Sequence, residues 1–272
     1  MFIFYSLVFG VIQGLTEFLP VSSSGHLLIL HEFFNFQLSD SLAFDVALHL
    51  GTFVALLIFF WPEVVKYLKA FFNSLGYWDL KANIDQRLAW MILVGSLPAI
   101  FIGYLLTIFD DGLLRSVTSA AIVLIAFGIL FFIYEIIGQK NKDLSQLSWA
   151  GALRIGLAQI LALIPGVSRS GVTIIAGLGE NLKRTEAARF SFLLSLPVIF
   201  AAGVKKSFDL IQQGINPSEI GLFVVGFVVS GVVGYFCLKY FLQYLANHSL
   251  NVFGIYRIIL GAAVLIYFLV IK

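Results

Sequence analysis

Long apolar stretches, each interrupted by only a few polar residues, recur along nearly the whole chain. Six of them reach the roughly 20 residues that a helix needs to cross the hydrocarbon core of a bilayer. They cover about residues 42–61, 88–107, 117–137, 188–206, 218–239 and 252–271. The pattern predicts an all-α polytopic membrane protein with about six transmembrane helices.

Two further apolar segments, residues 1–36 and 150–180, are each broken by a proline and a serine-rich turn. The limb that follows the first break, Leu27 to Phe36, is too short to span a bilayer. Membranes tolerate such broken helices where they line a cavity or are buried in protein. We therefore expect two re-entrant helical hairpins whose polar tips lie inside the membrane.

The two broken segments repeat each other at a constant offset of 146 residues. The identical pairs include Gly10 and Gly156, Gln13 and Gln159, Ser22 and Ser168, Ser24 and Ser170, and Gly25 and Gly171. This correspondence predicts an internal duplication within a single membrane domain that covers residues 1–272. Repeat one is expected at about residues 1–140 and repeat two at about residues 150–272.

Composition agrees with a membrane location. Hydrophobic residues make up 60% of the chain and charged residues 12%, and the mean hydropathy is +0.98. Such a chain cannot cover a surface that faces water, so most of its exterior faces lipid. The net charge of +2 is too small to indicate a nucleic-acid partner. The single cysteine, Cys237, excludes an intramolecular disulfide.

Lysine and arginine concentrate in loops that alternation of the spans places on one side of the membrane. These residues are Lys66, Lys69, Lys81, Arg87, Lys140, Lys142, Arg154, Lys183, Arg184 and Arg189. The positive-inside rule assigns that side to the cytoplasm. The first hairpin then enters from outside and the second from inside. The two halves would form an inverted-topology repeat, with the hairpin tips meeting near the midplane.

The first tip, PVSSSGH, carries residue types suited to nucleophilic or acid–base chemistry. Gln13 and Glu17 share one face of the preceding helix, because they are four residues apart. Ser22 is placed to cap the helix that resumes after the proline, and Ser23 and His26 follow it. Serines in membrane helices often bond only to a backbone carbonyl, whereas a carboxylate at this depth is seldom merely structural. The cluster predicts an activated nucleophile or a general acid–base site.

The second tip, PGVSRSGVT, holds an arginine between two serines. A guanidinium group stays protonated and offers a planar fork that suits phosphate oxygens. Arg169, with Ser168, Ser170 and Thr173, therefore predicts a phosphate-binding site. The alternative is that Arg169 is a structural partner of Glu17 across the repeat.

Other polar residues in the spans receive a structural interpretation. Asp45 and His49 are four residues apart at the start of a span, and we expect them to bond each other. Arg257, in the last span, is expected to pair or to extend toward the interface, without a role in the site. His31 and His248 belong to no cluster.

The motifs QGLTEFLPVSSSGH at residues 13–26 and PGVSRSGVT at residues 165–173 resemble the two signatures of bacterial undecaprenyl pyrophosphate phosphatases of the bacitracin-resistance type. The resemblance covers nearly the whole chain, including the IYR segment at residues 255–257. It implies a multi-pass enzyme of the bacterial plasma (inner) membrane. Its partner would be a polyprenyl pyrophosphate lipid, which it hydrolyses to the monophosphate carrier used for peptidoglycan synthesis, and this reaction confers bacitracin resistance.

Carried over by position, the resemblance implies roles for individual residues. The catalytic residues would be Glu17, Ser23 and His26, and the phosphate-binding residues Ser22, Ser168, Arg169, Ser170 and Thr173. The family is similar in requiring a divalent cation, Mg²⁺ or Ca²⁺, for which Glu17 and Gln13 are the expected ligands. Many members have glutamate at the position of Gln13, so a site built on two carboxylates is in question here. The resemblance leaves a homodimer open.

Three attacking groups are chemically open: Ser23 activated by His26, His26 itself, or a water activated by Glu17 or His26. We favour Ser23 with His26, in an active site open to the outer face. The alternative function is a secondary transporter or flippase for an anion or lipid phosphate, because inverted repeats of broken helices are typical of transporters. A transporter needs no nucleophile and base beside its anion site, so the cluster at the first tip favours hydrolysis.

Overall fold

The computed structural model describes residues 2–34, 41–109, 116–213, 216 and 219–268, and the regular secondary structure within them is entirely helical. The expected all-α membrane fold is thereby confirmed. The helices are α1 (Phe2–Phe18), α2 (Ser23–Phe34), α3 (Ser41–Phe59), α4 (Trp61–Gly76), α5 (Ile84–Phe109), α6 (Val117–Ile137), η1 (Leu144–Gln146), α7 (Trp149–Ala158), η2 (Gln159–Leu163), α8 (Arg169–Gly179), α9 (Arg184–Gln213), α10 (Ile220–Asn247) and α11 (Asn251–Ile266).

Four of these helices, α5, α6, α9 and α10, are long and apolar enough to cross a membrane. Helices α3 and α4 pass the same test together, but they are bent by 78° at the break between them, so they count as a fifth candidate. Helix α11 is apolar but has only 16 residues. The predicted span at 252–271 also includes residues 269–271, which lie outside the described residues. Length therefore supports four or five spans where the hydrophobic pattern predicts six.

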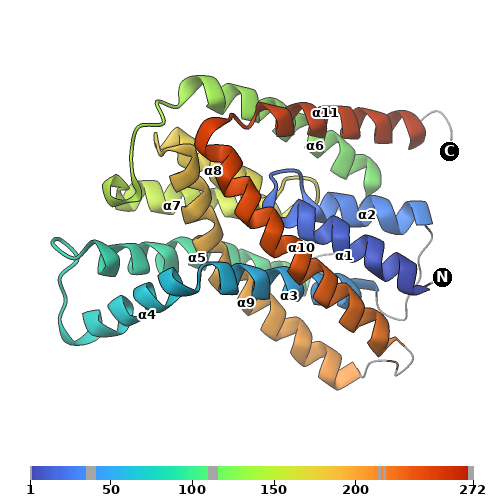
Figure 1. The fold of residues 1–272 in the computed structure, drawn as a ribbon, viewed down its shortest axis with the longest axis horizontal. Coiled ribbons are helices and arrows are strands. Elements are labelled where there is room, and N and C mark those ends of the chain that lie inside the picture. Colours follow the sequence, from blue (N-terminus) through green and yellow to red (C-terminus); the bar gives the residue numbers. More distant parts are fainter. Residues whose placement is uncertain (1, 35–40, 110–115, 214–215, 217–218, 269–272) are drawn as a thin grey trace.

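Both broken segments fold as helical hairpins. Helices α1 and α2 pack against each other across the first tip, and α7 with η2 packs against α8 across the second. Figure 1 shows α1 and α2 toward the end of the molecule that holds both termini, and α7 and α8 toward the opposite end. The two tips meet between these ends. This arrangement supports our proposal of an inverted repeat.

Helices of the first half pack on helices of the second half through small residues. Helices α1 and α3 both cross α10, and α6 crosses α11. A methyl group added at Gly51 of α3 would lie 2.2 Å from the carbonyl oxygen of Phe227 in α10. One added at Gly128 of α6 would lie 2.9 Å from the carbonyl oxygen of Gly254 in α11. Such close backbone approach is the usual basis of helix packing in lipid, where apolar burial provides little driving force.

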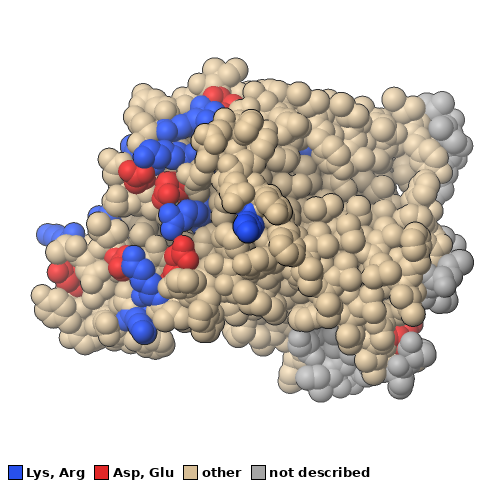
Figure 2. Space-filling model, in the orientation of Figure 1, with Lys and Arg blue, Asp and Glu red and all other residues tan. Residues whose placement is uncertain are grey.

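Charged side chains gather at one end of the molecule, opposite the termini (Figure 2). Ion pairs there include Lys66 with Asp85, Arg154 with Glu180, Lys183 with Asp143, and Arg184 with Glu135. The Glu135 carboxylate also accepts a hydrogen bond from the backbone N–H of Leu250 at 2.8 Å. It thereby joins the end of α6 to the start of α9 and of α11. The positive-inside rule places this end in the cytoplasm, which stays a prediction.

Candidate active site

The two tips share one backbone conformation. Ser22 has a φ of 73° and Ser168 a φ of 71°, a left-handed value that is uncommon for residues other than glycine. Each serine also caps the helix that follows it. The Ser22 hydroxyl oxygen accepts a hydrogen bond from the N–H of Gly25 at 3.3 Å, and that of Ser168 accepts one from Gly171 at 3.1 Å. The cap expected at Ser22 is confirmed, and its equivalent recurs 146 residues later.

The tips contact each other inside the molecule. The Ser170 hydroxyl donates a hydrogen bond to the carbonyl oxygen of Leu19, next to the first tip, at 3.3 Å. A methyl group added at Gly25 would lie 3.5 Å from the Cα atom of Gly166 in the second tip. Any site at the tips is therefore built from both halves of the chain.

Glu17 lies at the centre of this contact and is 7% exposed. Its Oε1 atom accepts a hydrogen bond from Nη2 of Arg169 at 2.8 Å. Its Oε2 atom accepts one from the Ser23 hydroxyl at 2.8 Å and one from Nε2 of Gln13 at 3.1 Å. These charge-assisted bonds offset the cost of burying the carboxylate. The structure thus brings together the acid, serine and arginine that the sequence singles out.

Arg169 pairs with Glu17 and still keeps a donor for a ligand. Its Nη1 atom is buried and has no hydrogen-bond partner within the described part of the chain. A buried N–H without an acceptor costs about 1–3 kcal/mol, and more when it is charged. A phosphate oxygen would provide that acceptor. The two interpretations of Arg169, structural partner and phosphate ligand, are therefore compatible.

His49 belongs to the same group, which the sequence did not indicate. The predicted pair of Asp45 and His49 is wrong, because Oδ1 of Asp45 pairs instead with Nε2 of His31 at 2.8 Å. Nδ1 of His49 lies 3.1 Å from Oε2 of Glu17 and 2.9 Å from Nε2 of Gln13. Its side chain is 33% exposed, against 7% for Glu17. His49 therefore lies between the buried carboxylate and the exterior of the protein.

His26 bonds to the last helix rather than to Ser23. Its Nδ1 atom lies 2.8 Å from the carbonyl oxygen of Ser22, and its Nε2 atom lies 2.7 Å from the hydroxyl oxygen of Tyr256. The Ser23 hydroxyl is engaged with Glu17 instead. The structure therefore gives Ser23 a carboxylate partner in place of the imidazole that we favoured from the sequence.

The predicted phosphate-binding hydroxyls are all buried and bonded within the protein. The Thr173 hydroxyl donates to the carbonyl oxygen of Arg169 at 2.7 Å and lies 2.5 Å from the Ser191 hydroxyl. The Ser168 and Ser170 hydroxyls lie 3.2 Å apart. These side chains, like Ser22 at the first tip, stabilise the turns that present Glu17, Ser23 and Arg169.

A second arginine fastens the two tips together. Arg257 is fully buried, and its guanidinium group donates to the carbonyl oxygens of Pro20 at 3.1 Å, Gly166 at 2.6 Å and Leu124 at 3.3 Å. These carbonyls belong to the first tip, the second tip and α6. Of the two outcomes expected for Arg257, pairing is confirmed, and its partners belong to both tips. Every residue carries a carbonyl, so the sequence holds no signal for such partners.

Gln13 and Glu17 are the residues that would hold the divalent cation expected from the sequence. Oε1 of Gln13 is buried without a hydrogen-bond partner in the described residues, beside the Glu17 carboxylate. Among those residues no group of three or more His, Cys, Asp or Glu side chains could hold a metal ion. Mg²⁺ is usually held by one or two protein carboxylates together with substrate phosphates. A cation held by these two residues would therefore need further ligands from a phosphorylated substrate.

Comparisons with known proteins give one family. Residues 6–263 match the family described as bacitracin resistance protein BacA. The chain is 44% identical over 260 residues to the undecaprenyl-diphosphatase of Rubrobacter xylanophilus, which covers 95% of this chain and 96% of that protein. It is 39% identical to the protein of that name from Desulforudis audaxviator, over 97% of both chains. It is 41% identical to the one from Saccharophagus degradans, over 96% of both.

Proposed function

From the finding that the chain belongs to the bacitracin resistance protein BacA family, we propose that it hydrolyses undecaprenyl pyrophosphate to undecaprenyl phosphate and phosphate. One observation carries this proposal beyond the names of the relatives. Glu17 holds the hydroxyl hydrogen of Ser23 on one oxygen and Arg169 on the other. This arrangement supports the assignment of Ser23 as nucleophile, Glu17 as base and Arg169 as phosphate ligand, a set of groups that serves hydrolysis and that a transporter does not need.

We infer that Glu17 is the general base of the reaction. Its Oε2 atom lies 2.8 Å from the Ser23 oxygen and takes the hydroxyl proton as that oxygen attacks the terminal phosphorus. Undecaprenyl phosphate leaves, and water then releases the phosphoryl group from Ser23. Arg169 binds the non-bridging oxygens of the terminal phosphate and stabilises the charge that develops on them.

Two further features of the site support this chemistry. The N-terminus of α8, which begins at Arg169, directs backbone N–H groups and the positive end of a helix dipole at the second tip. Gln13 and Glu17 are the residues that would hold Mg²⁺ or Ca²⁺, and the bound cation would offset the negative charge of the pyrophosphate.

We propose that the enzyme works in the bacterial plasma (inner) membrane, with its charged end in the cytoplasm and its active site open to the outer face. The first hairpin extends toward the end opposite the charged one (Figures 1 and 2), which supports this orientation. The polyprenyl tail would lie among the lipid-facing helices. The product would return as the carrier for peptidoglycan synthesis, and loss of the pyrophosphate form would confer bacitracin resistance. Pairing of two copies stays a prediction.

Phosphate release from undecaprenyl pyrophosphate by detergent-purified protein with Mg²⁺ tests the proposal. We expect Glu17→Gln, which removes the base and keeps the shape, to lower the rate at least about 100-fold. The control is Glu180→Gln, which breaks the ion pair with Arg154 at the charged end and should leave the rate within about twofold of wild type. Absence of release from folded wild type with either cation would refute the enzyme and favour the transporter.

A further inference from the structure

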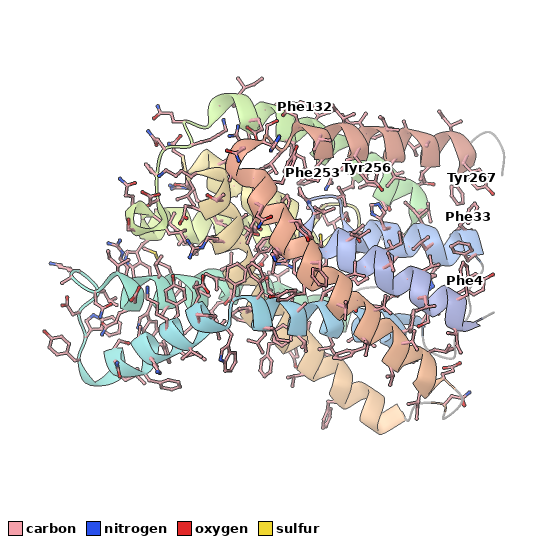
Figure 3. All side chains as sticks on the ribbon, viewed as in Figure 1. Phe4, Phe33, Phe132, Phe253, Tyr256 and Tyr267 are labelled. Carbon is pink, nitrogen blue, oxygen red and sulfur yellow. The ribbon has the colours of Figure 1, made fainter. Side chains whose placement is uncertain are left out.

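We propose that Tyr256 is a positioning residue of this site and acts through His26, an inference that rests on the proposed phosphatase function. The Tyr256 hydroxyl oxygen lies 2.7 Å from Nε2 of His26, and the two rings are parallel within 2°, with centroids 5.7 Å apart. Figure 3 shows Tyr256 on α11, a helix that neither motif includes. The pair therefore joins the last helix to the first tip.

The direction of these hydrogen bonds follows from their partners. Nδ1 of His26 faces the carbonyl oxygen of Ser22, which can only accept, so Nδ1 carries a hydrogen. His26 is 8% exposed and its described hydrogen-bond partners include no carboxylate, so burial favours the neutral ring. A neutral imidazole holds one N–H, and Nε2 is then an acceptor. Tyr256 must donate its hydroxyl hydrogen to it.

This chain of bonds fixes the backbone just before Ser23. Tyr256 holds His26, and His26 holds the carbonyl group of Ser22 at its left-handed φ of 73°. Ser23 follows directly and donates to Glu17. Arg257, the next residue of α11, fastens the carbonyls of the two tips. Consecutive residues of one helix therefore set where the nucleophile lies relative to the base and the phosphate ligand.

The first test replaces only the hydroxyl group. Tyr256→Phe keeps the ring, and we expect kcat to fall about fivefold to tenfold, as for loss of one neutral hydrogen bond, with KM within about twofold of wild type. Tyr267→Phe is the matched control, because Tyr267 lies on the same segment, is 39% exposed against 44% for Tyr256, and contacts Phe33 (Figure 3). Equal kcat values for the two variants would overturn the proposal.

A double substitution tests whether Tyr256 acts through His26. In a His26→Ala background, Tyr256→Phe should cause no further loss of kcat, because alanine has no side-chain acceptor for the hydrogen bond of Tyr256. A further fivefold loss would show that Tyr256 acts independently of His26 and would overturn the inference.

Nitrogen NMR of the wild-type protein labelled at its four histidines gives a readout that needs no substrate. We expect a His26 ring with its hydrogen on Nδ1, assigned by its absence from His26→Gln. Tyr256→Phe should shift the Nε2 resonance of this ring and leave those of the other histidines in place. An unmoved resonance refutes the bond even in an active enzyme. An inactive wild type with the expected shift refutes the phosphatase function and, with it, the positioning role.

Discussion

Arg257→Met removes the guanidinium group that fastens the two tips and keeps a side chain of similar length. The carbonyl oxygens of Pro20, Gly166 and Leu124 would lose the hydrogen bonds that they accept from Arg257. Because Arg257 is fully buried, lipid or bulk water cannot replace it without a rearrangement of the tips. We expect both the stability and the activity of the protein to fall.

The expected loss in the free energy of unfolding follows from the three hydrogen bonds of Arg257. Side-chain hydrogen bonds in membrane proteins contribute on average about 0.6 kcal/mol each, which sets a lower estimate of about 2 kcal/mol for the three. Hydrogen bonds to charged groups contribute about 1.5–3 kcal/mol each. Counting only the two bonds at 3.1 and 2.6 Å, this range gives about 3–6 kcal/mol. The free energy of unfolding should therefore fall by about 2–6 kcal/mol.

Unfolding of the purified protein in mixed micelles by increasing denaturing detergent measures this loss, and phosphate release measures its effect on the site. Lys239→Met is the matched control, because it removes one exposed cation whose described contact is with the Tyr240 ring, at 6.0 Å from its centroid. The control should change stability by less than about 1 kcal/mol. An Arg257→Met protein as stable and as active as Lys239→Met would refute the role given to these bonds.

Three further predictions concern the metal, the opening of the site and the packing. EDTA should abolish phosphate release and added Mg²⁺ should restore it, whereas release that persists without a divalent cation would contradict the proposed cation. His49→Ala should lower the rate about tenfold, because His49 contacts Glu17, and Asp45→Asn should change it less than about threefold, because Asp45 pairs with His31 instead. Equal losses would contradict this assignment. Gly51→Ala should lower the yield of folded protein, since the added methyl group would lie 2.2 Å from the Phe227 carbonyl oxygen. Gly76→Ala, where that methyl group would meet nothing within 4 Å, should not, and similar yields would contradict the packing.

Much of the fold could be predicted because the length of each apolar stretch can be read directly from the local sequence. Helix α6 runs from Val117 to Ile137, as the apolar stretch predicts. Helices α5 and α9 start at Ile84 and Arg184, before their predicted starts, because their polar first turns are stabilised by ion pairs at the charged end. The bend between α3 and α4 lies beside Pro62, which occupies the first turn of α4.

The candidate site could be predicted only in part. Glu17 and Arg169 could be predicted as site residues, because burying a charge in an apolar segment costs free energy and such residues usually have a function. The contacts of His49 could not be predicted. The spacing of residues within α3 suggests Asp45 as its partner, whereas the actual partner, Glu17, lies on α1. Contacts between distant helices depend on how the helices cross, which periodicity does not specify.

During biosynthesis, the first tip is made long before Arg257, which donates a hydrogen bond to it. Arg257 follows Pro20 by 237 residues. At a synthesis rate of roughly 5–20 residues per second, the first hairpin waits roughly 10 to 50 s for that guanidinium group. Helix α10, on which α1 packs, is also made late. The first hairpin must therefore lie in the membrane without this partner until α11 has left the ribosome, and a translation arrest before α11 would leave the two tips without the bonds from Arg257.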